Sequence, residues 1–103
     1  MARKWVVVLL ILLGHLASRP AHTASIGCPR ALHRHLFEQP SLFNGDPARL
    51  ADMIPIYGKW DVSRPATFPE GYFLVCQYEG TQEVRTLHVP ASAKFCDIDG
   101  FCR

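Results

Sequence analysis

The sequence lacks the features that define several common classes of protein. Its longest apolar run, Trp5 to Leu13, is far shorter than the roughly 20 residues that a membrane-spanning helix requires. No Gly-x-Ser-x-Gly motif marks a nucleophilic serine, and no internal repeat, low-complexity stretch or sustained block of charge occurs. A permanent membrane anchor, a serine hydrolase of this type and a repeat protein are therefore not expected.

The amino end has the order of residues found in secretory signals. A short cationic stretch, Met1 to Lys4, precedes the apolar run, which Gly14 and His15 interrupt. We predict a cleavable signal over residues 1–24, followed by one small exported domain over residues 25–103. The competing interpretation is a bacterial lipoprotein anchored through Cys28.

Charge argues against two classes of partner. The chain has 11 Lys and Arg against 9 Asp and Glu, and Arg3, Lys4 and Arg19 lie in the predicted signal, which leaves 8 against 9 and a net charge of −1. A domain without a basic run has no electrostatic reason to bind nucleic acid or an anionic membrane. We expect neither as a partner.

The remainder of the chain predicts an α+β fold. Short helices are expected over 29–38, where Leu32 and Leu36 are four apart, and over 46–54, where Asp-Pro resembles a helix start. An antiparallel meander of three strands is expected to follow, over residues 72–78, 84–89 and 95–98. Three aromatic residues between the expected helices and strands are predicted to pack in the core, covering the helix against the sheet: Tyr57, Trp60 and Phe68.

All four cysteines lie in the predicted exported domain, which is small enough to need covalent stabilisation. An even number of cysteines in an oxidising compartment predicts two disulfides. We prefer Cys76 with Cys96, which links two strands, and Cys28 with Cys102, which ties the amino end to the carboxyl end.

The carboxyl-terminal turn favours this pairing. Asp99-Gly100 is a typical two-residue hairpin loop, which would place Ile98 opposite Phe101. Cys96 and Cys102 would then lie on opposite faces of the ribbon, so a bond between them is disfavoured.

Candidate metal and catalytic residues are few. His33 and His35 would diverge on a helix, and Asp97 to Gly100 resembles the start of a calcium loop without its later glutamate. Glu79 and Glu83 flank a turn rather than a cleft. We expect no metal, no cofactor and no enzymatic activity.

The second half of the chain contains Gly58-x-Trp60, then Tyr72-x-Leu-Val-Cys-x-Tyr-x-Gly-Thr81, then a Leu-Pro step, which His88-Val89 interrupts here, and a final Cys96. In this pattern, over roughly residues 46–96, the chain resembles a family of small exported proteobacterial proteins without a characterised function. The resemblance implies a periplasmic address and a Cys76 to Cys96 disulfide. It implies no activity.

A second likeness is to the periplasmic inhibitors of c-type lysozyme, which carry a Ser-Gly-x-Ala-Lys-Tyr-like loop. Ser92-Ala93-Lys94-Phe95 is similar to the Ala-Lys-aromatic step of that loop. A serine hydroxyl and a lysine ammonium can engage the carboxylates of a glycosidase cleft. We therefore expect a non-enzymatic periplasmic or secreted protein that binds an unknown protein or envelope ligand, with Ser92, Lys94 and Trp60 as candidate binding residues. The alternative is an inhibitor of a lysozyme-type hydrolase.

Overall fold

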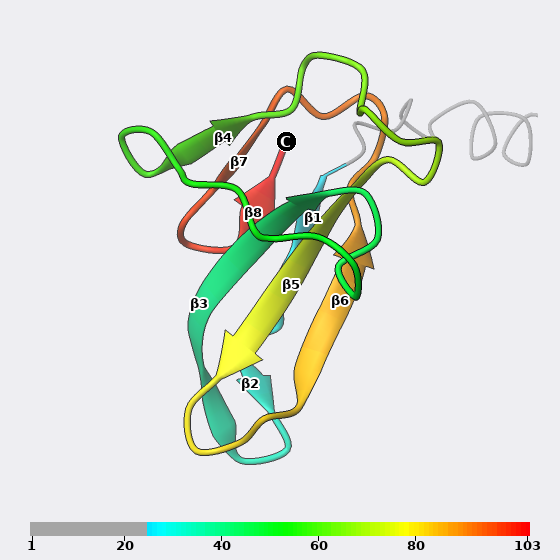
Figure 1. Ribbon diagram of the computed structural model, residues 1–103. Coiled ribbons are helices and arrows are strands. Elements are labelled where there is room, and N and C mark those ends of the chain that lie inside the picture. The colour runs from blue at the N-terminus through cyan, green and yellow to red at the C-terminus, as the bar shows by residue number, and fades with distance from the viewer. Residues whose placement is uncertain (1–24) are drawn as a thin grey trace, which may run out of the picture.

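The computed structural model describes residues 25–103, which form two antiparallel sheets and no helix (Figure 1). The predicted signal, residues 1–24, lies outside the described residues. The eight strands are β1 (Ile26–Gly27), β2 (Ala31–Leu32), β3 (His35–Asn44), β4 (Lys59–Asp61), β5 (Tyr72–Tyr78), β6 (Val84–His88), β7 (Phe95–Asp97) and β8 (Phe101–Cys102). The predicted α+β class is therefore wrong, and this part of the chain folds as an all-β unit.

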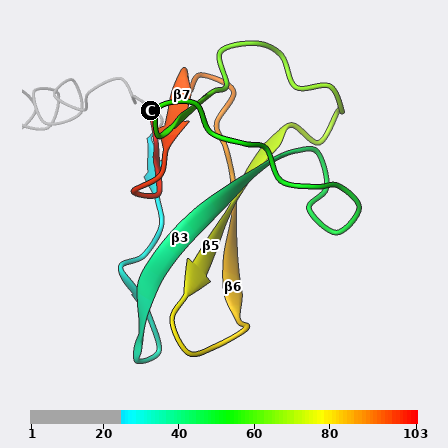
Figure 2. The ribbon, with the colours of Figure 1, turned by 60° about the vertical axis from the view of Figure 1, so that its left-hand side comes forward.

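The two sheets have four strands each. The order is β1-β8-β7-β4 in the first and β2-β3-β5-β6 in the second. β3, β5 and β6 form the long twisted ribbon of the second sheet, and the short strands of the first lie across one end of it (Figures 1 and 2). Within residues 25–103, no helix is long and apolar enough to cross a membrane.

The strand predictions for the second half of the chain are confirmed. β5 covers the predicted residues 72–78, β6 ends one residue earlier than predicted, and β7 forms at 95–97. Alternation along β5 places Leu74, Cys76 and Tyr78 on the buried face, at 2 % exposure or less.

The predicted helix at 29–38 is replaced by a β-hairpin. Leu32 pairs with His35 across a turn in which His33 has a φ of 51°, and the main chain continues as β3. Leu32 is buried but Leu36 is 62 % exposed, so the two leucines do not share a buried face. The four-residue spacing was therefore not a helical stripe.

β3 continues through Pro40 because of the phase of its hydrogen bonds. Leu42, two residues further along, turns its carbonyl away from β5 and accepts a hydrogen bond from the Met53 N–H at 2.8 Å. Pro40 has the same phase and lies opposite Cys76, so its missing N–H removes no bond to β5. Pro40 is thus accommodated within a strand.

The predicted helix at 46–54 is also wrong. Asp46 does accept a hydrogen bond from the Ala48 N–H at 2.9 Å, as a helix cap would, but only one turn forms. Neither main-chain group of Met53 is free to make helical hydrogen bonds. Its N–H donates to the Leu42 carbonyl, and its carbonyl accepts from the Trp60 indole N–H at 2.8 Å. These long-range bonds hold residues 51–56 extended.

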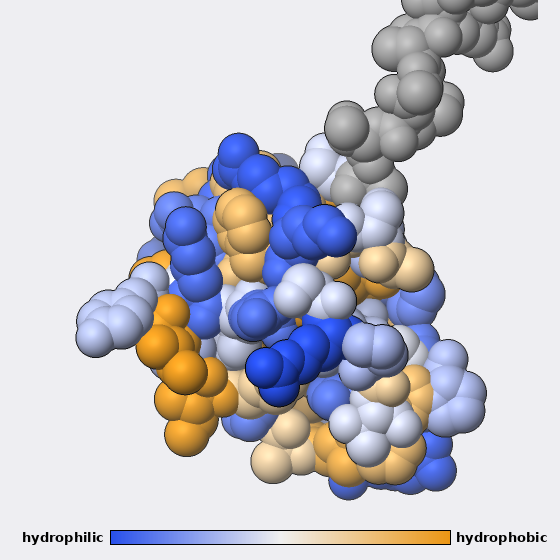
Figure 3. Space-filling model, turned by 90° about the horizontal axis from the view of Figure 1, so that it is seen from above, coloured by the Kyte–Doolittle hydropathy of each residue, from blue (hydrophilic) through white to orange (hydrophobic). Residues whose placement is uncertain are grey.

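The core lies where the two sheets meet. Its largest fully buried members are Leu42, Leu74, Tyr78 and the half-cystines of Cys76, Cys96 and Cys102, each at 2 % exposure or less. Trp60 adds to this core, as expected, at 4 % exposure. Seen from above, other apolar side chains remain outside it and project from one side of the molecule (Figure 3).

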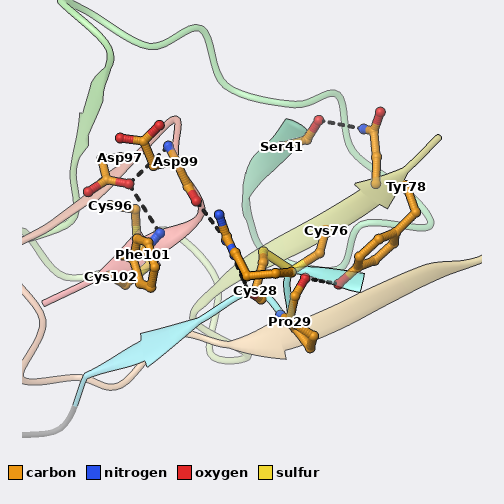
Figure 4. The surroundings of a disulfide bond; sticks show 12 residues. Cys28, Pro29, Ser41, Cys76, Tyr78, Cys96, Asp97, Asp99, Phe101 and Cys102 are labelled. Carbon is orange, nitrogen blue, oxygen red and sulfur yellow. Dashed lines mark hydrogen bonds between the residues drawn. A yellow bond between two sulfur atoms is a disulfide. The ribbon is translucent and has the colours of Figure 1, made fainter. Parts of the chain in front are cut away.

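Two disulfides are present, as expected, but the preferred pairing is wrong. Cys28 is bonded to Cys76, and Cys96 is bonded to Cys102 (Figure 4). The first bond joins the end of β1 to the centre of β5 and so links the two sheets. Because the sulfur of Cys28 is bonded to Cys76, it is not available to carry a lipid.

The register of the last hairpin explains the second disulfide. Asp97 folds its carboxylate over the turn and accepts hydrogen bonds from the N–H groups of Asp99 and Phe101, at 3.0 and 3.1 Å (Figure 4). The loop between the strands therefore spans three residues, 98–100, instead of two, and Cys96 pairs directly with Cys102. Two cysteines that face each other on adjacent strands can be bridged.

Candidate functional site

The most exposed apolar feature of the described chain is a tight hairpin that precedes β4. Ile56 and Lys59 exchange two main-chain hydrogen bonds, at 2.8 and 3.1 Å, across the two-residue loop of Tyr57 and Gly58. Both loop residues have a positive φ, 51° and 74°, as in a type I′ turn. We call residues 54–59 the apolar tip.

The side chains of the apolar tip point away from the core. Tyr57 is 99 % exposed, Ile54 is 87 % exposed and Ile56 is 72 % exposed. Ile98, whose N–H donates to the Gly58 carbonyl at 3.0 Å, adds a fourth apolar side chain that is half exposed. Figure 3 shows apolar surface on the side of the molecule that carries β4, which is the side of the tip.

Tyr57 occupies a conformation that does not suit a large side chain. A positive φ is uncommon for residues other than glycine, and Asn or Asp is the usual first residue of a type I′ turn. Its ring contributes nothing to the core, because the residue is almost fully exposed. The stability of this protein therefore gives no reason for a tyrosine at this position.

The base of the apolar tip is rigid. The Trp60 indole N–H donates to the Met53 carbonyl across the hairpin, and Trp60 is itself buried. Lys59 and Trp60 pair with Asp97 and Cys96 of β7, beside the Cys96–Cys102 disulfide. The tip is therefore a preorganised projection rather than a loose loop.

A hollow lies on each side of the tip, and Met53 and Trp60 line both. The first, of about 490 Å³, is otherwise lined by Ile54, Ile56, Lys59, Asp61 and Phe95. The second, of about 380 Å³, is bounded by the tip residue Pro55, by Ile98 and by the carboxylates of Glu38 and Asp52. Each hollow combines an apolar lining with a few polar groups, as binding surfaces do.

Acidic groups predominate around the tip. The two hollows contain three carboxylates, of Glu38, Asp52 and Asp61, and one ammonium, of Lys59. Lys59 lies over the Phe95 ring, 4.7 Å from its centroid. The Ser63 hydroxyl and N–H both donate to Asp61, and these hydrogen bonds lower the pKa of its carboxyl.

Ser92 and Lys94, the residues selected from the lysozyme-inhibitor likeness, do not form a projecting loop. Ser92 lies in a tight turn that is closed by the Ala93 N–H on the Pro90 carbonyl. Lys94 is exposed, and its main chain is bound to Val62 and Arg103. Trp60, the third candidate, is buried beneath the tip and exposes little surface for binding.

The other candidate residues do not assemble into a site. In the described part of the chain, no group of three or more His, Cys, Asp or Glu side chains is placed to hold a metal ion. His33 instead lies 3.4 Å from the Glu83 carboxylate, and His35 and His88 bond separate main-chain carbonyls, of Glu79 and Glu70. Asp97 is occupied with its own turn.

Sequence reasoning missed the apolar tip. Tyr57 was expected in the core, and Ile54 was placed in the predicted helix over residues 46–54. Phe68, also expected in the core, is 42 % exposed. The signal that identifies the tip is Tyr57-Gly58 between Ile56 and Lys59, because a glycine-containing pair flanked by strand residues predicts a two-residue hairpin.

Comparisons with known proteins give no relative. No protein-family model matches the chain, and no curated protein or solved structure is similar to it. The resemblance to small exported proteobacterial proteins therefore stays a prediction.

Proposed function

We propose that this chain is a non-enzymatic exported protein that binds a partner protein through the apolar tip. The observation that supports this most strongly is Tyr57, an almost fully exposed aromatic ring held at a positive φ on a rigid hairpin. Unfavourable conformations of this kind concentrate at functional positions, and aromatic residues supply much of the binding energy at interfaces.

Charge favours a protein rather than a lipid surface as the partner. Loops that insert into anionic membranes are surrounded by lysine and arginine. Here carboxylates outnumber ammonium groups in the two hollows beside the tip. A protein cleft with an apolar floor and a basic margin complements this arrangement.

The compartment follows from the cysteines. Two disulfides indicate an oxidising, extracytoplasmic environment. Together with the predicted signal over residues 1–24, they support secretion or a periplasmic location in a bacterium.

Site-specific photo-crosslinking in the exporting cells tests the proposal. A photoreactive phenylalanine analogue replaces Tyr57 in one variant and Phe68, an exposed aromatic residue elsewhere, in the matched control. We expect a discrete cross-linked protein from position 57 alone, which Ile56→Ser abolishes and excess unlabelled protein competes away. Equal products from both positions would refute the proposal, as would selective binding of the protein to vesicles of phosphatidylcholine and phosphatidylglycerol.

Inhibition of a lysozyme-type hydrolase is a second candidate. It is favoured by the position of Phe95, which follows Lys94 and lines the same hollow as Ile54 and Ile56 of the tip. Both segments could therefore contact one cleft. On this hypothesis the purified protein inhibits c-type lysozyme, Lys94→Ala removes most of the inhibition, and Arg64→Ala, a nearby control, retains it. Full lysozyme activity at a large molar excess of the protein would eliminate this candidate.

A further inference from the structure

The outer edge of β6 is the longest unpaired strand edge in the described chain. β6 is a terminal strand of its sheet and has five residues, whereas the other terminal strands, β1, β2 and β4, have two, two and three. No other described segment lies along its outer side in Figures 1 and 2.

The hydrogen-bond phase shows which main-chain groups this edge presents. Val89 N–H donates to the Tyr72 carbonyl at 2.9 Å, just beyond the end of β6. Bonded positions alternate along an antiparallel pair, so Leu87 and Arg85 also bond to β5. Val84, Thr86 and His88 therefore direct their N–H and carbonyl groups outward, and no described residue bonds to these main-chain groups.

β6 lacks the usual devices that protect a free edge. It contains no proline or glycine, and its register with β5 is continuous and free of bulges. The charged residue within it, Arg85, alternates onto the opposite face from Val84, Thr86 and His88. Edges of this length are normally interrupted, charged or covered, because they pair readily with another strand.

We infer that β6 pairs antiparallel with β6 of a second copy of this chain, about a two-fold axis at Thr86. In this register Thr86 faces Thr86 of the second copy and Val84 faces its His88, so all three outward residues find outward partners. Three such pairs exchange two bonds each, or about six main-chain hydrogen bonds. Facing threonines are a favourable cross-strand pair, and the interface is closed by symmetry.

The alternative registers are poorer. A shift by two residues in one direction places Arg85 opposite Arg85 of the second copy, and like charges in that position are unfavourable. A shift in the other direction places Val84 opposite Pro90, which has no N–H to donate. The edge is thus self-complementary in one register, which favours a second copy over an unrelated extended segment.

Sedimentation equilibrium of the purified exported protein, from about 10 µM to 1 mM, tests this inference. We expect a reversible dimer whose dissociation constant rises at least ten-fold in Thr86→Pro, because proline removes an N–H that makes no bond within the chain. Thr86→Val, which keeps that N–H, should dimerise like the parent protein. A monomer throughout this concentration range would overturn the inference.

Amide hydrogen exchange provides the second measurement, which needs no variant. The N–H groups of Val84, Thr86 and His88 should become protected as the protein concentration rises, whereas those of Ile56 and Lys59 in the apolar tip should not change. A dimer that leaves the three β6 amides unprotected would show that the copies meet elsewhere and would refute the β6 interface. This outcome would leave the proposed role of the tip untouched.

Discussion

Arg30 joins segments of the described chain that are separate in sequence. Its guanidinium donates to the carbonyls of Cys28 and Asp99, the latter at 2.8 Å. It also lies between the rings of Phe37 and Phe101, 4.3 and 4.9 Å from their centroids. Because these rings belong to different sheets, one planar cation connects β3 with β8.

Replacing Arg30 with lysine should destabilise the protein. Lysine keeps the charge but loses the planar contact with both rings and the forked donation to two carbonyls. We expect Arg30→Lys to lower the free energy of unfolding by about 1 to 2 kcal/mol, measured by urea denaturation. The control is Arg34→Lys, at an exposed position, which should have almost no effect. Equal stability of the two variants would contradict the assigned role.

Tyr78 gives the stability a dependence on alkaline pH. Its buried hydroxyl donates to the Pro29 carbonyl at 2.8 Å, and burial raises the pKa of the phenol, which Arg85 and Arg30 partly oppose. In the unfolded chain the Tyr78 phenol ionises near pH 10, whereas in the folded chain it still holds its proton at that pH. The contribution of Tyr78 to stability is therefore fully present below pH 10 and falls as the pH rises above it.

The variant that tests this effect is Tyr78→Phe. We expect it to cost about 1 kcal/mol at pH 8, because the Pro29 carbonyl loses its partner. Between pH 10 and 11 the stability of Tyr78→Phe should decline less steeply than that of the parent protein. Urea denaturation across this pH range measures both effects, and parallel decline of the two proteins would show that Tyr78 is not the group responsible.

At the scale of elements, the sequence predicted the strands in the second half of the chain but not the structure of the first half. β5 alternates between core and surface and ends two residues before Gly80, so its bounds follow from local pattern. β3 contains Pro40 and continues through it, because the N–H that proline lacks would point away from β5. No local pattern in the sequence reveals this direction. The last hairpin shifted by one residue because the Asp97 side chain entered the turn.

The apolar tip depends on Trp60 for its rigidity. Trp60→Phe keeps an aromatic ring in the core but leaves the Met53 carbonyl without its donor. We expect a loss of about 1 to 3 kcal/mol and faster amide exchange at Ile56 and Lys59, whose N–H groups close the hairpin. Unchanged exchange at these two residues would mean that the turn is rigid without the indole.

At the scale of the whole molecule, the two disulfides differ in what they restrict. Cys28 and Cys76 are 48 residues apart and link the sheets, whereas Cys96 and Cys102 are 6 residues apart within one hairpin. Loop-closure entropy predicts about 4 kcal/mol for the long loop and about 2 kcal/mol for the short one. The Cys28–Cys76 pair depends on how the two sheets meet, and the Cys96–Cys102 pair depends on the register of the last hairpin, which explains why the sequence led to the wrong pairs.

Paired alanine variants measure this difference. Cys28→Ala with Cys76→Ala should lower the free energy of unfolding about twice as much as Cys96→Ala with Cys102→Ala. Thermal and urea denaturation provide the comparison, and a non-reducing peptide map of the parent protein verifies the pairs. A greater loss from the second variant would contradict the assignment of the sheet-linking role to Cys28–Cys76.

The candidate site also belongs to this scale, because residues distant in sequence create it. Composition did not reveal that Tyr57 projects while Trp60 is buried three residues later, since both are aromatic and both suit a core. Their separation arises from the two-residue turn, which reverses the chain between them, and from the pairing of Trp60 with Cys96.

The proposed role of the apolar tip is tested most directly by Tyr57→Asn. Asparagine suits the positive φ and forms the preferred Asn-Gly turn, so this change removes the ring without disturbing the hairpin. The measurement is the yield of partner cross-linked through a photoreactive residue at the neighbouring position 98, with and without Tyr57→Asn. We predict at least about a ten-fold fall in yield, with an equal or higher melting temperature. An unchanged yield in a folded variant would contradict the account.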